Sequence, residues 1–381
     1  MSPERFISSK LHFQGSIAAI SIAVSFLVII LAIAISSGFR NEVRDGVAEM
    51  TGDLRIQHVS GADIPSSLPS EEEILSLPGV RAMTGVVVRQ GIVRSGDVIH
   101  GVVVKGVPDR IDSSLCVSIP QRLSEITGLG VGDEMTTYFV GEKVRVRRFR
   151  VSEIHRDILD MDDNLLVYAR LEDMQRLSQL GEDRVSAIEV SLRSEMRSAP
   201  AMEELRGRIG SILSLSGRDE EEDLYVQSSV SAYPQLFDWL DLLDFNVLFI
   251  LLLMILVAGF NMVSGLLIVL FRNISTIGTL KTLGMSDRGI AKVFLLLSSS
   301  VVLKGMLAGN VLALLFCLVQ GTTHLIPLDP ANYFVSFVPV HVNVFSVLAA
   351  DLIAYAAIML ILLIPSLFIS RVDPARTVRA E

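Results

Sequence analysis

The sequence predicts an α-helical membrane protein with four transmembrane helices and a large α+β domain inserted between the first and second of them. Of its 381 residues, 50% are hydrophobic, and the mean hydropathy is +0.52. The apolar residues gather in four runs, each long enough to cross about 30 Å of hydrocarbon at about 1.5 Å per residue. Between the first two runs lie about 200 residues of ordinary globular composition, enough for a core of their own.

The four runs divide the chain into alternating membrane and extramembrane segments. We expect transmembrane helices at 15–38, 245–270, 290–319 and 344–369. The segments between and beside them are a lead at 1–14, the inserted domain with helical stalks at 39–244, a short segment at 271–289, a loop at 320–343 and a tail at 370–381. The first run exceeds the about 7–15 residues of a secretory signal core, so we interpret it as an uncleaved anchor.

Lysine and arginine in the short connections predict the orientation of the chain. They occur in the lead, in the segment 271–289 and in the tail, whereas the loop 320–343 has neither. Because short cytoplasmic loops are enriched in these residues, the lead, the segment 271–289 and the tail are expected in the cytoplasm. The inserted domain and the loop 320–343 are then expected to face outward.

Short elements of both kinds are predicted in the inserted domain. Residues 54–58 alternate as a strand does, and two β-branched runs at 80–94 and 98–107 flank a Ser-Gly-Asp turn that is typical of a hairpin. Ser70 precedes three glutamates and is expected to cap a helix, because acidic side chains are favoured in a first turn. Strands and helices in this order predict an α+β domain, with two lobes as one arrangement.

The run VRVRRFRV at 144–151 alternates basic and apolar residues. We interpret it as a half-buried strand with a solvated face, because the surrounding domain is acidic and the chain has a net charge of −9. No nucleic-acid partner is therefore expected.

Enzymatic motifs are missing from the sequence. There is no G-x-x-x-x-G-K-[ST] phosphate-binding loop, and the six histidines are scattered without a catalytic constellation. The two cysteines, Cys116 and Cys317, have no metal-ligand spacing. The acidic run 218–223 lacks the ligand spacing of a calcium loop and is interpreted as solvated. We expect no catalytic residue, no metal and no cofactor in this chain.

The segment 271–289 has the pattern of a short amphipathic helix between two spans. Ile277, Leu280 and Leu283 follow helical spacing, and Gly284 ends the pattern. Such a helix is expected to lie along the membrane surface and to dock into a groove on a soluble partner; an interfacial linker without a partner is the alternative. The candidate coupling residues are Arg272, Ile277, Leu280, Lys281, Leu283 and Gly284.

Three polar residues within the apolar runs need partners, because polar groups are costly in lipid. Lys304 and Asp351 fall in the outer half of the bilayer on the third and fourth spans, where they are placed to pair. Either a packing salt bridge or a gating pair is consistent with this. Asn261 on the second span is expected to form an interhelical hydrogen bond.

Several motifs together resemble the permease subunits of type VII ABC systems. RNISTIGTLKTLGMS at 272–286 resembles the coupling helix of that superfamily, and DPARTVR at 373–379 resembles its tail. The resemblance narrows to lipoprotein-releasing (Lol-type) permeases through VAGFNMVS at 257–264 and FVPVHVN at 337–343. Further resemblance is carried by ISSGFRNEVRDG at 35–46 and DILDMDDNLL at 157–166.

This resemblance implies a non-catalytic subunit of the bacterial inner membrane with its inserted domain in the periplasm. A separate cytoplasmic ABC ATPase would hold ATP and Mg²⁺ and push on the coupling residues. A second permease subunit, either another copy or a paralogue, would complete the assembly. The cargo would be a lipoprotein, extracted from the outer leaflet and passed to a periplasmic carrier. Its acyl chains would lie near Ile35, Phe39, Leu248 and Leu252.

Two other functions remain open from the sequence. A permease of the same architecture exports small molecules or controls a cell-wall hydrolase. A periplasmic ligand sensor is less consistent with the chain, because the short tail after Ser370 offers no output domain.

Overall fold

The computed structural model describes residues 16–96, 98–139, 144–156, 165–215, 221, 223–329, 333 and 335–367. The chain divides into two compact units. The helical unit comprises Met1–Arg40, Leu240–Ile326 and Val338–Glu381, and the inserted unit comprises Asn41–Trp239 and Pro327–Phe337. The lead expected at 1–14, the tail expected at 370–381 and most of the motif at 157–166 lie outside the described residues.

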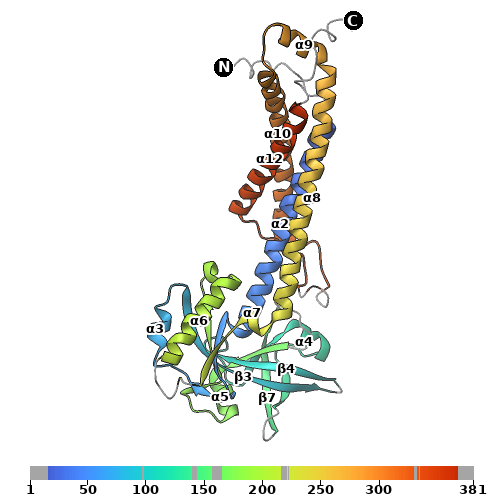
Figure 1. Cartoon of the computed structure of the whole chain (residues 1–381). Helices are drawn as coiled ribbons and strands as arrows, with labels where there is room; N and C mark the ends of the chain where they lie inside the picture. Colours follow the sequence, from blue (N-terminus) through green and yellow to red (C-terminus); the bar gives the residue numbers. More distant parts are fainter. Residues whose placement is uncertain are drawn as a thin grey trace. The chain divides into compact units, whose positions relative to one another are not determined.

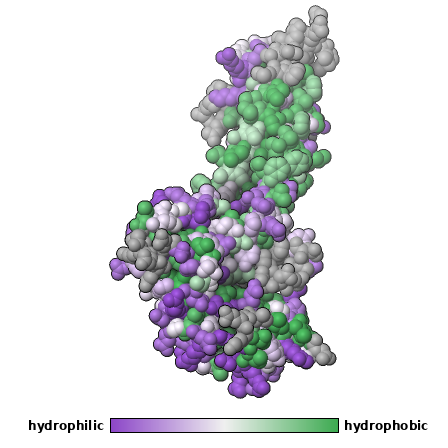
Figure 2. All heavy atoms as spheres, turned by 60° about the horizontal axis from the view of Figure 1, so that its bottom comes forward, coloured by the Kyte–Doolittle hydropathy of each residue, from purple (hydrophilic) through white to green (hydrophobic). Residues whose placement is uncertain are grey.

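Among the described residues, four helices are long and apolar enough to cross a membrane. They are α2 (Ser16–Thr51), α8 (Pro234–Arg272), α10 (Asp287–Thr323) and α12 (Val344–Leu367) (Figure 1). The helices predicted at 39–49 and 234–244 are the end of α2 and the start of α8, each continuous with its span. Figure 2 shows the hydrophobic side chains that these helices present at their surface, as expected for segments surrounded by lipid.

Small residues allow α10 to pack closely against α2. A Cβ atom on Gly309 would lie 2.4 Å from the carbonyl oxygen of Ala23, and one on Gly305 would lie 2.7 Å from Ile22 Cγ2. Gly305 and Gly309 are four residues apart and face the same side of α10, which is the small-xxx-small arrangement that brings membrane helices together. Ile22 and Phe26 of α2 are fully buried there, so α2 contributes much of the core of the helical unit.

Nine of the described strands of the inserted unit form one sheet, in the order β11-β1-β10-β3-β4-β8-β5-β7-β6. Their bounds are β1 Leu54–His58, β3 Val80–Ser95, β4 Val98–Val107, β5 Cys116–Pro120, β6 Glu134–Phe139, β7 Arg145–His155, β8 Leu165–Arg170, β10 Ala187–Leu192 and β11 Leu224–Ser228. Two short strands, β2 (Ile64–Pro65) and β9 (Arg184–Val185), pair separately.

The long strand β3 belongs to two parts of this sheet. Its first half pairs with β10, and its second half pairs with β4 as the predicted hairpin, with Ser95 opposite Val98 and so part of the strand rather than of the turn. Residues 91–94 of β3 also pair with β6. Because β3 has both β4 and β6 as neighbours, the strands β3-β4-β8-β5-β7-β6 close into a ring. The α+β class, the hairpin and the strand at 54–58 are confirmed.

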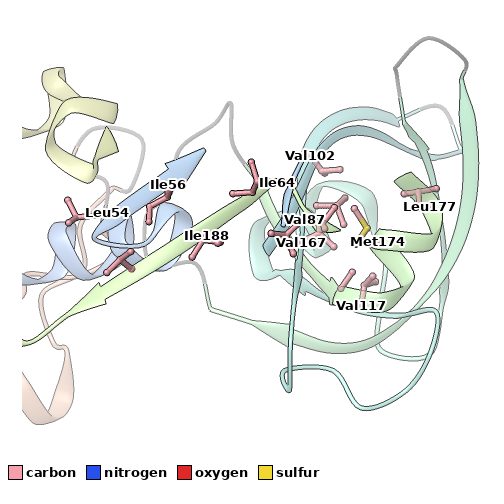
Figure 3. Packing of buried hydrophobic residues seen from close by; sticks show 14 of the residues in the cluster. Leu54, Ile56, Ile64, Val87, Val102, Val117, Val167, Met174, Leu177 and Ile188 are labelled. Atoms are coloured by element: carbon pink, nitrogen blue, oxygen red, sulfur yellow. The ribbon is translucent and has the colours of Figure 1, made fainter. Parts of the chain in front are cut away.

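One hydrophobic core runs through the inserted unit. Figure 3 shows Leu54, Ile56 and Ile188 at one end of this core and Val167 and Met174 at the other. Helices cover the sheet at several places: α3 (Glu71–Leu75), α4 (Gln121–Thr127), α5 (Leu171–Ser178), α6 (Ala199–Leu215) and α7 (Ser229–Ala232). In β7, Phe149 and Val151 are buried while Arg148 and Arg150 are exposed, so the interpretation of this run as a half-buried strand is confirmed.

The predicted cap of α3 is wrong in its chemistry. Ser70 stands at the N-cap position, but its side chain does not accept a hydrogen bond from the helix. Instead its backbone N–H and its hydroxyl donate to Glu221 Oε1 at 2.9 and 2.7 Å. Glu221 is fully buried, so this member of the acidic run 218–223 is not solvated as expected. The carboxylate comes from a distant part of the chain, which local sequence cannot show.

Candidate functional site

The segment after α8 folds into the short helix α9 (Ile274–Thr282). The Asn273 side chain donates to the carbonyl of Val269 at 2.8 Å and closes the end of α8. Gly284 has φ +89°, a conformation that glycine adopts without strain, and it turns the chain out of α9. Ser286 then caps α10 by accepting a hydrogen bond from the backbone of Gly289 at 3.2 Å.

The three apolar residues of the predicted docking face do not lie on one face. Ile277 is 1% exposed and packs in the core of the helical unit, and Leu280 is half-buried against the same core. Leu283 is 78% exposed. Leu283 does not align with the other two because α9 ends at Thr282, and Leu283 therefore leaves the helical spacing. Ile277 packs inside the helical unit, and docking of this segment on a partner stays a prediction.

Lys281 links α9 to the next span. Its Nζ atom lies 2.8 Å from Asp287 Oδ1 at the start of α10, and its side chain is only 11% exposed. Its exposed neighbours form what we call the coupling surface, whose members are Phe271, Arg272, Ser275, Thr276, Thr279, Thr282, Leu283 and Gly284. Of the predicted coupling residues, Arg272, Leu283 and Gly284 therefore lie on this surface, while Ile277, Leu280 and Lys281 hold α9 in place.

A polar network that the sequence reading missed connects α2 and α8 within the helical unit. Ser36 Oγ donates to Asp244 Oδ1 at 2.5 Å. The Arg40 guanidinium forms ion pairs with Asp244 and, at 3.3 Å, with Asp241. Three aspartates at the start of α8, of which Asp241 and Asp244 belong to this network, were the available signal.

The four residues proposed for acyl-chain contact lie in different surroundings. Leu248 and Leu252 of α8 are exposed, the former by 63%. Phe39 of α2 is 8% exposed, and Ile35 is half-buried. Phe39 therefore faces the interior of the chain and does not share a surface with the two leucines. Depth along a span was the only guide to these residues, and depth does not determine which side of a helix is covered.

The intramembrane polar residues form interhelical hydrogen bonds. Asn261 Nδ2 of α8 donates to Ser21 Oγ of α2 at 2.5 Å. Asp351 Oδ2 of α12 accepts from Asn310 Nδ2 of α10 at 2.5 Å. Within the described part of the chain, Asp351 and Lys304 form no ion pair, and Lys304 is exposed. The expected partner of Asp351 was wrong, because Lys304 and Asn310 point to different sides of α10.

The inserted unit holds a buried charged cluster around the last turn of α2. Lys105 Nζ donates to the carbonyls of Glu49 and Met50 and pairs with Glu189. Glu189 also pairs with Arg55 at 2.9 Å. Burial lowers the pKa of Lys105, although the Glu189 carboxylate acts in the opposite direction.

The carboxylate of Glu49 extends this cluster toward the closed ring of strands. It accepts from Tyr168 Oη at 2.8 Å and from Arg110 Nη1 at 2.9 Å, and the Arg110 guanidinium lies 3.5 Å from the centre of the Tyr168 ring. Burial is the main cause that raises the pKa of Tyr168, and the Glu49 charge raises it further. The pKa of His155 is lowered to about 4, mainly by burial and secondly by the Arg110 charge. Sequence reasoning missed this cluster because its residues come from several strands and loops.

Two family models match the chain in order. The MacB-like periplasmic core domain matches residues 16–208, half of the chain, and the FtsX-like permease C-terminal model matches residues 248–374. An α+β domain inserted into a unit of four membrane-spanning helices, followed by such a C-terminal region, defines a multi-pass permease of the bacterial inner membrane with its inserted domain in the periplasm.

Known proteins resemble this chain over nearly its full length. The lipoprotein-releasing system transmembrane protein LolC of Xylella fastidiosa is 24% identical over 97% of this chain and 95% of its own. LolC of Neisseria meningitidis is 23% identical over 96% of this chain and 93% of its own. LolE of Haemophilus influenzae is 22% identical over 96% of this chain and 94% of its own. The periplasmic region of MacB from Actinobacillus actinomycetemcomitans aligns with 48% of this chain and 92% of its own, at 14% identity and a TM-score of 0.29.

The chain belongs to the family of permeases built on a MacB-like periplasmic core domain, and within it to the Lol-type permeases of the type VII ABC superfamily.

Proposed function

We propose that this chain is the permease subunit of an ABC transporter that releases lipoproteins from the inner membrane. The observation that carries this proposal is the similarity to LolC and LolE, which extends over both the spans and the periplasmic domain rather than over one of them. The motifs VAGFNMVS at 257–264 and FVPVHVN at 337–343, which resemble Lol-type permeases, also support this proposal.

The chain acts without chemistry of its own in this proposal. ATP and Mg²⁺ are held by a separate cytoplasmic ATPase, which docks on the coupling surface. The buried Ile277 and the ion pair between Lys281 and Asp287 support a mechanical role for α9, because they join it to the spans through packing and charge. A displacement of α9 is therefore passed to α10, and two arrangements of the spans follow the two nucleotide states of the ATPase.

The cargo in this proposal is an acylated lipoprotein in the outer leaflet. Its acyl chains contact the exposed face of α8 that includes Leu248 and Leu252, because hydrocarbon chains are accommodated on apolar surface. A second permease subunit, identical or paralogous, covers part of the same face. A periplasmic carrier receives the lipoprotein from the inserted domain.

Copurification tests the ATPase partner. The tagged full-length chain and its Leu283→Asp variant are purified in mild detergent, and the proteins that co-elute are identified. Leu283→Asp is expected to lose the ATPase, because it places a charge at the most exposed apolar position of the coupling surface. Leu325→Asp is the matched control, since this leucine is also exposed but lies in the connection between α10 and α12. An ATPase retained by Leu283→Asp contradicts the proposed surface.

Release of lipoproteins tests the cargo. Proteoliposomes that contain the purified complex and a fluorescent triacylated lipoprotein are expected to release it with ATP and a soluble carrier, and not with a non-hydrolysable ATP analogue. Release of small molecules instead, or copurification of an outer-membrane channel or a wall hydrolase, supports the alternative permease functions.

A further inference from the structure

Asn310 of α10 and Asp351 of α12 form a polar pair inside the helical unit. Asp351 is 7% exposed and lies about two turns into α12, well within its apolar stretch. Asn310 is half-buried and lies between the apolar halves of α10. Nearer the start of α10, Ser299 Oγ of this helix and Tyr355 Oη of α12 form a second contact of 2.7 Å. The pair between Asn310 and Asp351 thus belongs to the polar contacts that join α10 to α12.

Only one polar atom of each side chain in this pair forms a hydrogen bond with the other. Asn310 Nδ2 donates to Asp351 Oδ2. The other oxygen of each group, Asn310 Oδ1 and Asp351 Oδ1, is buried and has no hydrogen-bond partner. When Asp351 is ionised, both of these oxygens can only accept a hydrogen bond. Neither carries a proton to donate to the other, so they cannot form a hydrogen bond together. A buried polar atom left in this state costs free energy, particularly in hydrocarbon.

We propose that Asp351 is a proton-binding site and that its neutral carboxyl group closes a two-bond ring with the Asn310 carboxamide. One proton on Asp351 Oδ1 turns that oxygen into a donor, and Asn310 Oδ1 accepts from it. The planar acid and the planar amide then form two parallel hydrogen bonds. A single proton therefore satisfies both of the buried oxygens that the ionised form leaves without partners.

The surroundings of the pair favour the neutral form. Lys304, a lysine in the apolar stretch of α10, is exposed and forms no ion pair with Asp351 among the residues that the structure describes. Tyr355 of α12 is engaged by Ser299, and Cys317 of α10 carries no charge as a thiol. On α2 and α8, Arg40 and Asp244 form their own ion pair near the end of the spans. A charged carboxylate at this depth would be costly without a cation beside it.

Infrared spectroscopy of the full-length chain in lipid nanodiscs tests for the proton directly. The difference spectrum between the wild type and Asp351→Asn at neutral pH is expected to contain the carbonyl band of a protonated carboxylic acid, and Asn310→Ala is expected to shift that band upward in frequency. Lys304→Met is the control and should leave the band unchanged. Only carboxylate bands in the difference spectrum, or an acid band that appears only in Lys304→Met, would overturn the proposal.

Thermal unfolding of the same proteins gives a second test. Asp351→Asn is expected to stay within about 2 °C of the wild-type Tm, because two carboxamides form the same ring of two hydrogen bonds. Asp351→Leu should lower the Tm by several degrees, because it leaves both polar atoms of the Asn310 amide unpaired. If Asn and Leu at position 351 lower the Tm equally, the ring is not formed.

Discussion

Lys105 Nζ lies 2.7 Å from Glu189 Oε2 and donates to the backbone carbonyl of Glu49 at 2.8 Å, in the last turn of α2. A third contact, to the carbonyl of Met50 at 3.3 Å, completes the three donors of the ammonium group. The last carbonyls of a helix have no intrahelical partners and carry a partial negative charge. Lys105 therefore caps the end of the first long helix from within the periplasmic domain.

Replacing this lysine should destabilise the periplasmic domain. Lys105→Met keeps the apolar stem but removes the donor to the last carbonyls of α2 and one of the two cations that pair with Glu189, the other being Arg55. We expect a loss of about 2 kcal/mol in the free energy of unfolding. Urea unfolding of the full-length protein in detergent measures this. Arg147→Met, at an exposed position of β7, is the control and should change stability by less than about 0.5 kcal/mol. Equal effects of the two variants would contradict the capping role.

The buried His155 predicts a dependence of stability on pH. Its pKa is about 4 in the folded protein, compared with 6.5 for the ordinary side chain, because of burial and the nearby Arg110 charge. Between these values the unfolded chain binds more protons, so the free energy of unfolding falls as the pH is lowered from 6.5 to 4. The contribution of this histidine is up to about 3 kcal/mol.

His155→Gln should remove this contribution. The loss of stability between pH 6.5 and pH 4 is expected to be smaller in His155→Gln than in the wild type, as measured by urea unfolding at a series of pH values. His100→Gln changes a histidine on β4 and provides the comparison for a histidine elsewhere in the same sheet. A His155→Gln curve parallel to the wild-type curve over this range would show that His155 is not held neutral.

The contact of Gly309 with α2 predicts a steric effect in the membrane. In Gly309→Val the new Cβ atom would meet the carbonyl oxygen of Ala23 at 2.4 Å and Phe26 Cβ at 2.9 Å, so α10 must move away from α2. We expect a loss of about 1–3 kcal/mol, seen as a lower Tm in detergent. Ala308→Val, at the exposed neighbouring position, should leave the Tm nearly unchanged. A normal Tm for Gly309→Val would mean that the two helices are not in close contact.

Arg156 connects β7 to the segment Pro327–Phe337 within the inserted unit. Its guanidinium lies 4.7 Å from the centre of the Phe337 ring, and Nη2 donates to Ser336 Oγ at 2.9 Å. In Arg156→Ala two contacts are lost, each worth about 1 kcal/mol. We therefore expect the amide of Leu328, which donates to the carbonyl of Ser336, to exchange its hydrogen about 30 times faster. Hydrogen exchange with mass spectrometry measures this rate, and Arg147→Ala should leave it unchanged.

Much of the fold could be predicted because its signals are local. Apolar runs of sufficient length identified all four spans, and the β-branched runs on either side of Ser95-Gly96-Asp97 predicted the hairpin of β3 and β4. The cap of α3 was misjudged, since Glu221 reaches Ser70 from a distant position in the chain. The three apolar residues of the segment 271–289 do not share the expected face, because Leu283 lies beyond the end of α9 and Ile277 is buried.

The sequence by itself determined which segments enter the membrane, the class of the inserted domain and the Lol-type resemblance. These depend on composition, periodicity and short motifs, which act over a few turns of chain. Only the tertiary structure decided that Asp351 meets Asn310 rather than Lys304, that Phe39 faces inward, and that Lys105 closes the end of α2. The physical reason is that the rotation of each helix about its axis, and the partner of each buried polar group, are set by packing between segments far apart in the chain.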